Sequence, residues 1–235
     1  MKKIVVVMLC VVLALSMFAC KNSGSDMENK VESLSLPEGA EVLFVVVQDG
    51  ASGCNFYALE KDEGKWSEIF TCDGYLGWSG VCPAENKREG DGATPDGLYS
   101  FGELFGNKRA PVGVFGQYTK IEEDDYWDSD PSSDTYNQHV KGGDKSQAWH
   151  DRGLYEHLIK YQKSYAYAVM INYNVDPVVA GNGSAIFMHC TTPDETSSAG
   201  CVAIPEEKMA EALSYIDENA YILIVGSIED LENYI

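Results

Sequence analysis

Short runs of β-branched and aromatic residues, separated by turn residues, recur along this chain and limit its fold class more than any other feature. The run from Glu41 to Gln48 contains Val-Leu-Phe-Val-Val-Val and predicts a buried strand. Segments 55–59 and 66–71 flank Lys61-Asp62-Glu63-Gly64, which predicts a hairpin. Further strands are expected in four places: Gly97–Phe101, Tyr165–Tyr173, Ser184–His189 and Tyr221–Val225.

Only two segments of the sequence predict helices. Apolar residues at helical intervals predict one helix over Asp151–Gln162, and Pro205 is placed to open a second one. The acidic, aromatic stretch 120–145 has the composition of a long loop. Strands and helices do not alternate as they do in βαβ folds, so we expect a domain that is mainly β with a few helices.

The first twenty residues resemble a bacterial export signal. Lys2 and Lys3 precede an apolar run from Ile4 to Leu15, and Ala19-Cys20 follows. A basic start, a short apolar stretch and a small residue before the cleavage point are typical of a secretory signal. An ordinary signal peptide or a transmembrane anchor would be the alternatives, although spanning a bilayer takes about 20 apolar residues.

Ala19-Cys20 resembles the end of a lipobox, in which Cys20 becomes the lipidated first residue. We therefore expect a signal peptide over 1–19, a lipidated cysteine with a flexible tether over 20–36, and one catalytic domain over 37–235. The polar composition of the second segment suits a tether. The expected location is the cell envelope, with the protein anchored in a membrane through the Cys20 lipid and facing the periplasm or the exterior.

The charge of the chain argues against nucleic acid as a partner. The formal net charge is −20, and it becomes −22 when residues 1–19 are removed, because they contain Lys2 and Lys3 and no acidic residue. Binding of phosphate backbones needs clustered Lys and Arg.

Five cysteines remain after Cys10 and Cys20 are assigned to the signal and the lipid: Cys54, Cys72, Cys82, Cys190 and Cys201. The predicted hairpin places Cys54 roughly opposite Cys72 and favours a disulfide between them, with Cys72–Cys82 as the alternative. An odd number leaves at least one free thiol. No Cys-x2-Cys spacing exists, so we expect no metal site.

His189 and Cys201 are the residue types that nucleophilic catalysis needs. A neighbouring imidazole lowers the pKa of a thiol and takes its proton. Gly200 lets a substrate approach the backbone closely, and the Gly200 and Cys201 amides are candidates for an oxyanion hole. On the residues alone, Cys201 could equally be a small buried residue or half of a disulfide, and His189 a core histidine.

Three motifs in order resemble the L,D-transpeptidase catalytic domain (YkuD) family. The first runs from Lys87 to Gly97, and the others are Gly183-Ser-Ala-Ile-Phe-Met-His189 and Ser198-Ala-Gly-Cys-Val-Ala203. Tyr136-Asn137 and Tyr173-Asn174 lie between them, where one branch of the family has Tyr-Asn pairs. The resemblance covers roughly 43–213.

The sequence departs from the family's most familiar form at Ala199 and Ala203, where that form has His and then Arg or Asn. His189 is then the base, because His139, His150 and His157 are expected at surface or structural positions. Cys190, directly after the base, is expected to pack.

The resemblance implies a β-sandwich-like fold with a capping helix, and a cysteine enzyme without a cofactor that acts on peptidoglycan stem peptides. Cys201 would attack the bond between the L-centre of the third residue and a terminal D-Ala. Four residues are candidates for substrate binding: Arg88, Tyr136, Asn137 and Ser198. Ion pairing for Arg88 and core packing for Tyr136 and Asn137 are the alternatives. An L,D-carboxypeptidase, a related envelope amidase and a non-catalytic peptidoglycan-binding lipoprotein are the other functions that fit.

Overall fold

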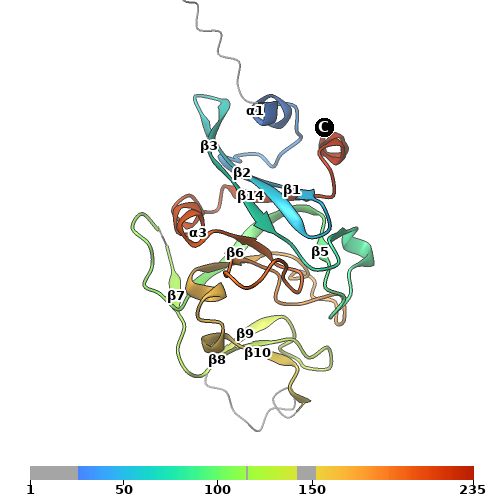
Figure 1. Cartoon of the computed structure of the whole chain (residues 1–235), viewed down its shortest axis with the longest axis vertical. Helices are drawn as coiled ribbons and strands as arrows, with labels where there is room; N and C mark the ends of the chain where they lie inside the picture. The colour runs from blue at the N-terminus through green and yellow to red at the C-terminus, as the bar shows by residue number, and fades with distance from the viewer. Residues whose placement is uncertain (1–25, 115, 142–151) are drawn as a thin grey trace, which may run out of the picture.

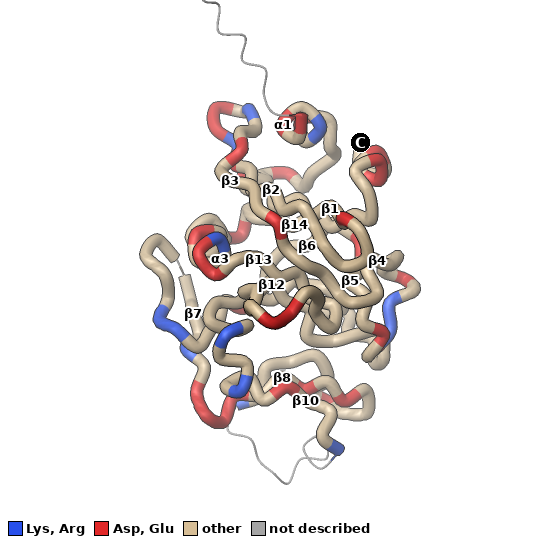
Figure 2. The backbone as a smooth tube through the Cα atoms, viewed as in Figure 1, with Lys and Arg blue, Asp and Glu red and all other residues tan. Residues whose placement is uncertain are grey.

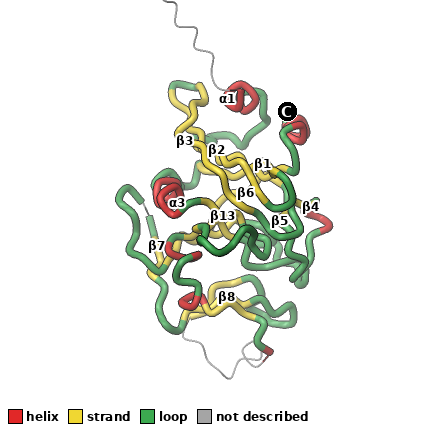
Figure 3. Tube along the Cα trace, viewed as in Figure 1, coloured by secondary structure: helices red, strands yellow, loops and turns green. Residues whose placement is uncertain are grey.

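A computed structural model describes residues 26–114, 116–141 and 152–235 (Figure 1). The signal peptide, Cys20 and His150 lie outside the described residues. Strands dominate, and the helices lie around them (Figure 3). The largest sheet is built from β1 (Val42–Asp49), β2 (Gly53–Asp62), β3 (Lys65–Tyr75), β6 (Gly97–Gly106), β7 (Tyr118–Lys120), β11 (Ala168–Ile171), β12 (Phe187–Cys190), β13 (Val202–Ile204) and β14 (Ala220–Val225).

This nine-stranded sheet closes on itself. Its order is β11-β12-β13-β3-β2-β1-β14-β6-β7, and β11 also pairs with β6. Because the first strand of the order meets the eighth, the sheet curves into a barrel-like or sandwich-like fold, as the resemblance implies. Strands β1, β12 and β14 and the hairpin form where the sequence predicts them, whereas β6 continues to Gly106 and β11 begins only at Ala168.

The barrel interior is the main hydrophobic core. Phe44, Phe56 and Met188 are fully buried there. Helix α3 (Glu206–Leu213) covers this core with Met209 and Leu213, which confirms the predicted capping helix. Pro205 is its N-cap residue.

The predicted Cys54–Cys72 disulfide is wrong. In the β2–β3 ladder, Cys54 pairs with Gly74 and Cys72 pairs with Phe56, so the two cysteines are offset by two residues. Diagonal neighbours of this kind lie too far apart for the Cα separation of a disulfide. The alternative with Cys82 is not formed either, since all five cysteines of the described residues are free thiols.

The N-terminal part of the domain begins earlier than the sequence suggests. Within the expected tether, helix α1 (Asp26–Val31) packs against β3, with Met27 and Val31 buried. The four-residue spacing of these two apolar side chains places them on one helical face. Residues 26–31 of the expected tether are therefore helical and packed against the domain, and α1 lies at the top of Figure 1 beside the β2–β3 hairpin. The 3-10 helix η4 (Glu229–Tyr234) places Leu231 in the same hydrophobic cluster as Met27 and Val31.

A small second sheet lies at the other end of the molecule (Figure 1). It has the order β10-β8-β9, built from β8 (Asp125–Asp128), β9 (Gln138–Lys141) and β10 (Tyr155–His157). The helix expected over Asp151–Gln162 is wrong: strand β10 and the 3-10 helix η2 (Leu158–Lys160) replace it, because pairing with β8 supplies the backbone hydrogen bonds. The expectation of a loop over 120–145 is wrong for β8 and β9.

The remaining elements are short. They are the pair β4 (Val81–Cys82) and β5 (Thr94–Pro95), and the 3-10 helices η1 (Ala84–Asn86) and η3 (Ser164–Ala166). Among the described residues, no helix is long and apolar enough to cross a membrane.

Candidate active site

His189 on β12 and Cys201, just before β13, lie on one face of the barrel. Strands β12 and β13 are parallel, with Met188 opposite Val202 and His189 opposite Ala203. Cys201 comes directly before β13. Because side chains alternate along a strand, Cys201 and His189 point to the same face, offset by two positions. Both line one cavity of about 280 Å³.

The hydrogen bond of His189 defines its tautomer. Its Nδ1 lies 2.9 Å from the backbone oxygen of Cys190. A carbonyl oxygen only accepts, so Nδ1 carries the hydrogen and Nε2 is left as the basic nitrogen. Burial lowers the pKa of His189 below its ordinary value, which keeps the imidazole neutral at pH 7. His189 is therefore prepared to accept a proton through Nε2.

The Cys201 thiol is protonated in this structure. Its Sγ donates to the Ala185 oxygen at 3.2 Å and accepts from the Phe187 amide at 3.4 Å. Burial, and then the charge of Glu156, raises the pKa of Cys201 to about 12. The expectation of a thiol pKa lowered by the imidazole is wrong for this state, because no His189 hydrogen bond to the thiol forms among the described residues.

Gly200 is held in a backbone conformation that other residues avoid. Its φ is +140°, and a Cβ there would lie 2.8 Å from the Ala93 oxygen. Its amide donates to Ser198 Oγ at 3.0 Å, and that hydroxyl donates to the Cys201 oxygen at 2.7 Å. The Gly200 amide is thus engaged in the loop, which leaves the Cys201 amide as the oxyanion candidate of the two.

The motif over 87–97 supports the loop that carries Cys201. Gly77 forms a bridge with Ser198, and its amide donates to Thr94 Oγ1 at 2.9 Å. The indole of Trp78 lies where a Cβ on Gly92 would be, so only glycine fits there. The two motifs, about a hundred residues apart in the chain, form one structural unit at the site.

Three predicted substrate-binding residues lie outside the cavity wall. Arg88 is exposed, and its guanidinium donates to the Glu85 and Lys87 carbonyls. Tyr136 is buried and accepts from the Gly183 amide. Of the four candidates, only Ser198 lines the cavity.

Asn137 is a structural amide rather than a free recognition group. Its Oδ1 accepts from the Trp127 indole and the Ala185 amide, each at 3.0 Å, and its Nδ2 donates to the Asn174 oxygen at 2.9 Å. These bonds attach the small sheet to the segment that leads into β12, the strand that contains His189. The Tyr136-Asn137 pair therefore stabilises the site through structural hydrogen bonds and does not line the cavity.

Sequence reasoning missed three residues near the thiol. Glu156 and Tyr165 line the cavity, and the Tyr165 hydroxyl donates to Glu156. The buried Lys87 pairs with Asp91 at 2.7 Å, and its charge lowers the pKa of Cys201. Glu156 lies in the segment 151–162, which the sequence predicted to be a helix. That prediction gave no indication that the Glu156 side chain lines the cavity.

The other described histidines have structural contacts. His139 lies between Glu103 and Asp125, at 2.9 and 3.1 Å, and His157 bonds the Glu123 backbone oxygen. Cys190 faces the barrel core, as expected for a packing residue. In the described part of the chain, no group of three His, Cys, Asp or Glu side chains has an arrangement that could hold a metal ion.

Several solved structures resemble this chain at low identity. Bd1075 of Bdellovibrio bacteriovorus has a TM-score of 0.42 and 14% identity, covering 83% of this chain and 53% of that one. The Ldtfm–avibactam carbamoyl enzyme has a TM-score of 0.38 and 15% identity, covering 80% of this chain and 49% of that one. L,D-transpeptidase 1 of Mycobacterium tuberculosis has a TM-score of 0.34 and 15% identity, covering 79% of this chain and 62% of that one. This chain thus spans about half to three-fifths of those chains.

The family assignment comes from the sequence match. No curated protein matches this sequence as a relative. The family described as "YkuD: L,D-transpeptidase catalytic domain" matches residues 52–225, well over half of the chain and all of the site described above. The chain therefore belongs to the L,D-transpeptidase catalytic domain (YkuD) family.

Proposed function

We propose that this protein is an L,D-transpeptidase-like cysteine enzyme that transfers acyl groups between peptidoglycan stem peptides. The observation that carries the proposal is the shared cavity, which both His189 and the Cys201 thiol line from one face of the sheet. The family match over 52–225 supports this reaction class.

The first half-reaction forms a thioester. Substrate entering the cavity displaces the thiol from the Ala185 oxygen, and His189 Nε2 takes its proton as Cys201 attacks the carbonyl of the third residue. The imidazolium then protonates the leaving D-Ala amine. Because both groups are neutral at rest, the thiolate forms only when substrate is present.

The oxyanion that develops on the attacked carbonyl needs hydrogen-bond donors. The Cys201 amide is the candidate, and the Ser198 bonds fix the loop that presents it. In the second half-reaction an amine resolves the thioester to a cross-link, or water resolves it to a tripeptide. An L,D-carboxypeptidase would use the second route alone.

The test is incubation of the purified protein with muropeptides that carry tetrapeptide stems, followed by mass spectrometry. We expect loss of the terminal D-Ala, and a cross-linked dimer when a second stem is present. The intact protein should gain the mass of the tripeptide donor during turnover. Unchanged muropeptides and an unmodified protein would contradict the proposal and favour the non-catalytic binding protein.

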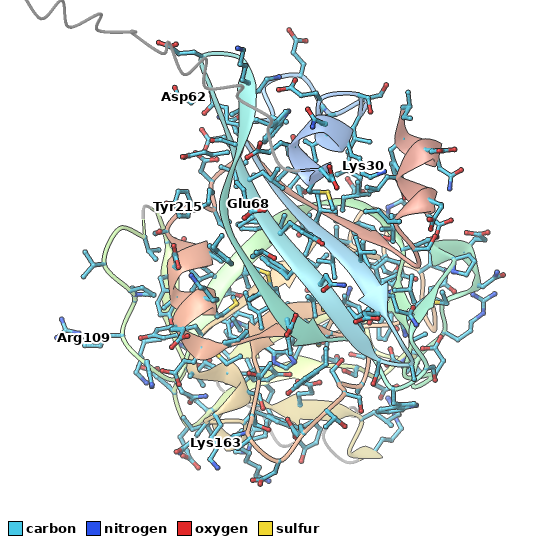
Figure 4. The ribbon with its side chains drawn as sticks, turned by 45° about the horizontal axis from the view of Figure 1, so that its top comes forward. Lys30, Asp62, Glu68, Arg109, Lys163 and Tyr215 are labelled. Atoms are coloured by element: carbon cyan, nitrogen blue, oxygen red, sulfur yellow. The ribbon has the colours of Figure 1, made fainter. Side chains whose placement is uncertain are left out.

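We further propose that the protein is anchored in a membrane through a lipid on Cys20. The signal-like segment before Cys20 supports this. Lys30 of α1 lies towards one end, and Lys163, beside the cavity residue Ser164, lies towards the other (Figure 4).

For the anchor, we expect the wild-type protein to enter the detergent phase on phase separation and the Cys20→Ala variant to remain in the aqueous phase or as precursor. Stable anchoring needs more than one acyl chain, so the mature N-terminus should carry several. Mass spectrometry of the N-terminal peptide checks this. A wild-type protein that is cleaved yet wholly aqueous would contradict the anchor without affecting the proposed chemistry.

A further inference from the structure

The cavity that holds Cys201 and His189 is acidic. Glu156 and Glu195 are among its lining residues, and none of these lining residues is Lys or Arg. Figure 2 shows acidic segments along the small sheet as well, but Asp125 and Asp128 of β8 are buried and bonded to His139 and Thr135. The acidity of the cavity therefore comes from Glu156 and Glu195. Charge complementarity favours a cationic group in such a cavity.

The second half-reaction supplies a cation of this kind. Its acceptor is an amine, and a primary alkylamine is an ammonium ion at neutral pH. An ammonium nitrogen has no lone pair, so it must lose a proton before it attacks the thioester. The site therefore needs a group that binds the ammonium and takes that proton.

The position of Glu156 suits this task. In the small sheet Glu156 is opposite Trp127, whose side chain packs in the core cluster that also contains Cys201 and Phe187. Paired residues point to the same face, so Glu156 is directed at the barrel face that carries the nucleophile. Glu195, by comparison, is exposed at the rim.

Tyr165 contacts both the Glu156 carboxylate and the His189 imidazole. Its hydroxyl donates to Glu156 Oε2, and its ring meets the His189 ring edge-on, with centroids 5.5 Å apart. Tyr165 is itself buried. Burial raises the pKa of Glu156 to about 7, so near neutral pH this carboxyl can both take up and release a proton.

We propose that Glu156 is the catalytic residue that binds the acceptor ammonium and takes its proton. This inference rests on the proposed function. The proton passes to Glu156, and the free amine attacks the thioester carbonyl. The C–S bond breaks, a C–N bond forms, and the Cys201 sulfur leaves with its electron pair. The second amine proton reaches that sulfur through His189 Nε2, and Glu156 returns its proton to water.

The same proton transfer helps the sulfur to leave. The Glu156 charge contributes to the raised pKa of Cys201, because a carboxylate disfavours a nearby thiolate. Once Glu156 has taken the ammonium proton it is neutral, and that repulsion is gone when the thiolate is expelled. Arrival of an amine, and not of water, thus prepares the site for release.

The test compares two nucleophiles on the acyl-enzyme of a tetrapeptide donor. One is a stem peptide with a side-chain ammonium, and the other is hydroxylamine, which is uncharged at pH 7. For Glu156→Gln we expect the ratio of transferred to hydrolysed product to fall about 10²-fold with the stem peptide. With hydroxylamine the ratio should stay close to that of the wild type. The defect with the stem peptide should shrink as the pH rises towards the amine pKa of about 10.

Two further variants serve as comparisons. Asp194→Asn removes a carboxylate from the adjoining surface and should leave both ratios unchanged. Tyr165→Phe removes the hydroxyl that holds Glu156 and should lower the stem-peptide ratio by less than Glu156→Gln does. An equal fall with both nucleophiles, or no fall with either, would overturn the role of Glu156. A wild-type protein that forms no acyl-enzyme would instead overturn the proposed function, and the intact-protein mass distinguishes the two results.

Discussion

Cys201→Ser should lower turnover of tetrapeptide muropeptides by at least about 10³-fold while leaving the fold intact. A serine hydroxyl fits the same space and can keep the bond to the Ala185 oxygen, so the loop that contains Gly200 is undisturbed. A hydroxyl is much harder to deprotonate than a thiol, and His189 is a weak base for it because burial lowers its pKa. Product formation by mass spectrometry measures the effect.

The matched control for this variant is Cys72→Ser. Cys72 lies on β3, does not line the cavity and is half-buried, so the same atomic change there should leave turnover near the wild-type rate. Circular dichroism and the melting temperature should match between the wild type and Cys201→Ser. A Cys201→Ser protein with the wild-type rate would mean that another group is the nucleophile.

The barrel strands could be predicted because their signal is local. Val42 to Val47 are all buried, and the Glu63-Gly64 turn lies where the hairpin was expected. The family could be predicted because its motifs around His189 and Cys201 survive in the sequence. The closure of the barrel could not, since the pairing of β11 with β6 is set by packing between distant segments.

The predictions that were wrong concern features that depend on long-range contacts, which no local sequence pattern indicates. The segment at 151–162 has apolar residues at helical spacing, yet Leu154 is exposed and Leu158 is buried. Pairing of Glu156 with Trp127 overrides that spacing, and the same pairing places Glu156 at the site. The raised pKa of Cys201 likewise follows from burial and from Glu156, neither of which the sequence shows.

His189→Ala should lower kcat/KM for tetrapeptide donors by roughly 10²- to 10⁴-fold, because no other imidazole of the described residues lines the cavity. In the wild type, the neutral imidazole is the active form. Burial places its pKa below 6.5, so activity should persist as the pH falls to 6.5 and be lost only as it passes below that value. The alanine variant should lack this acid limb, since it has no base to protonate.

A matched control for His189 is His157→Ala, which removes a described histidine on β10 whose ring bonds the Glu123 backbone oxygen and does not line the cavity. It should keep both the rate and the acid limb. Cys201 has its pKa raised to about 12 by burial and Glu156, so a fixed thiolate cannot replace the base in His189→Ala at neutral pH. If His189→Ala retained the wild-type rate with the same acid limb, the proton from Cys201 would have to pass to Glu156 instead, and the assignment of His189 as the base would be abandoned.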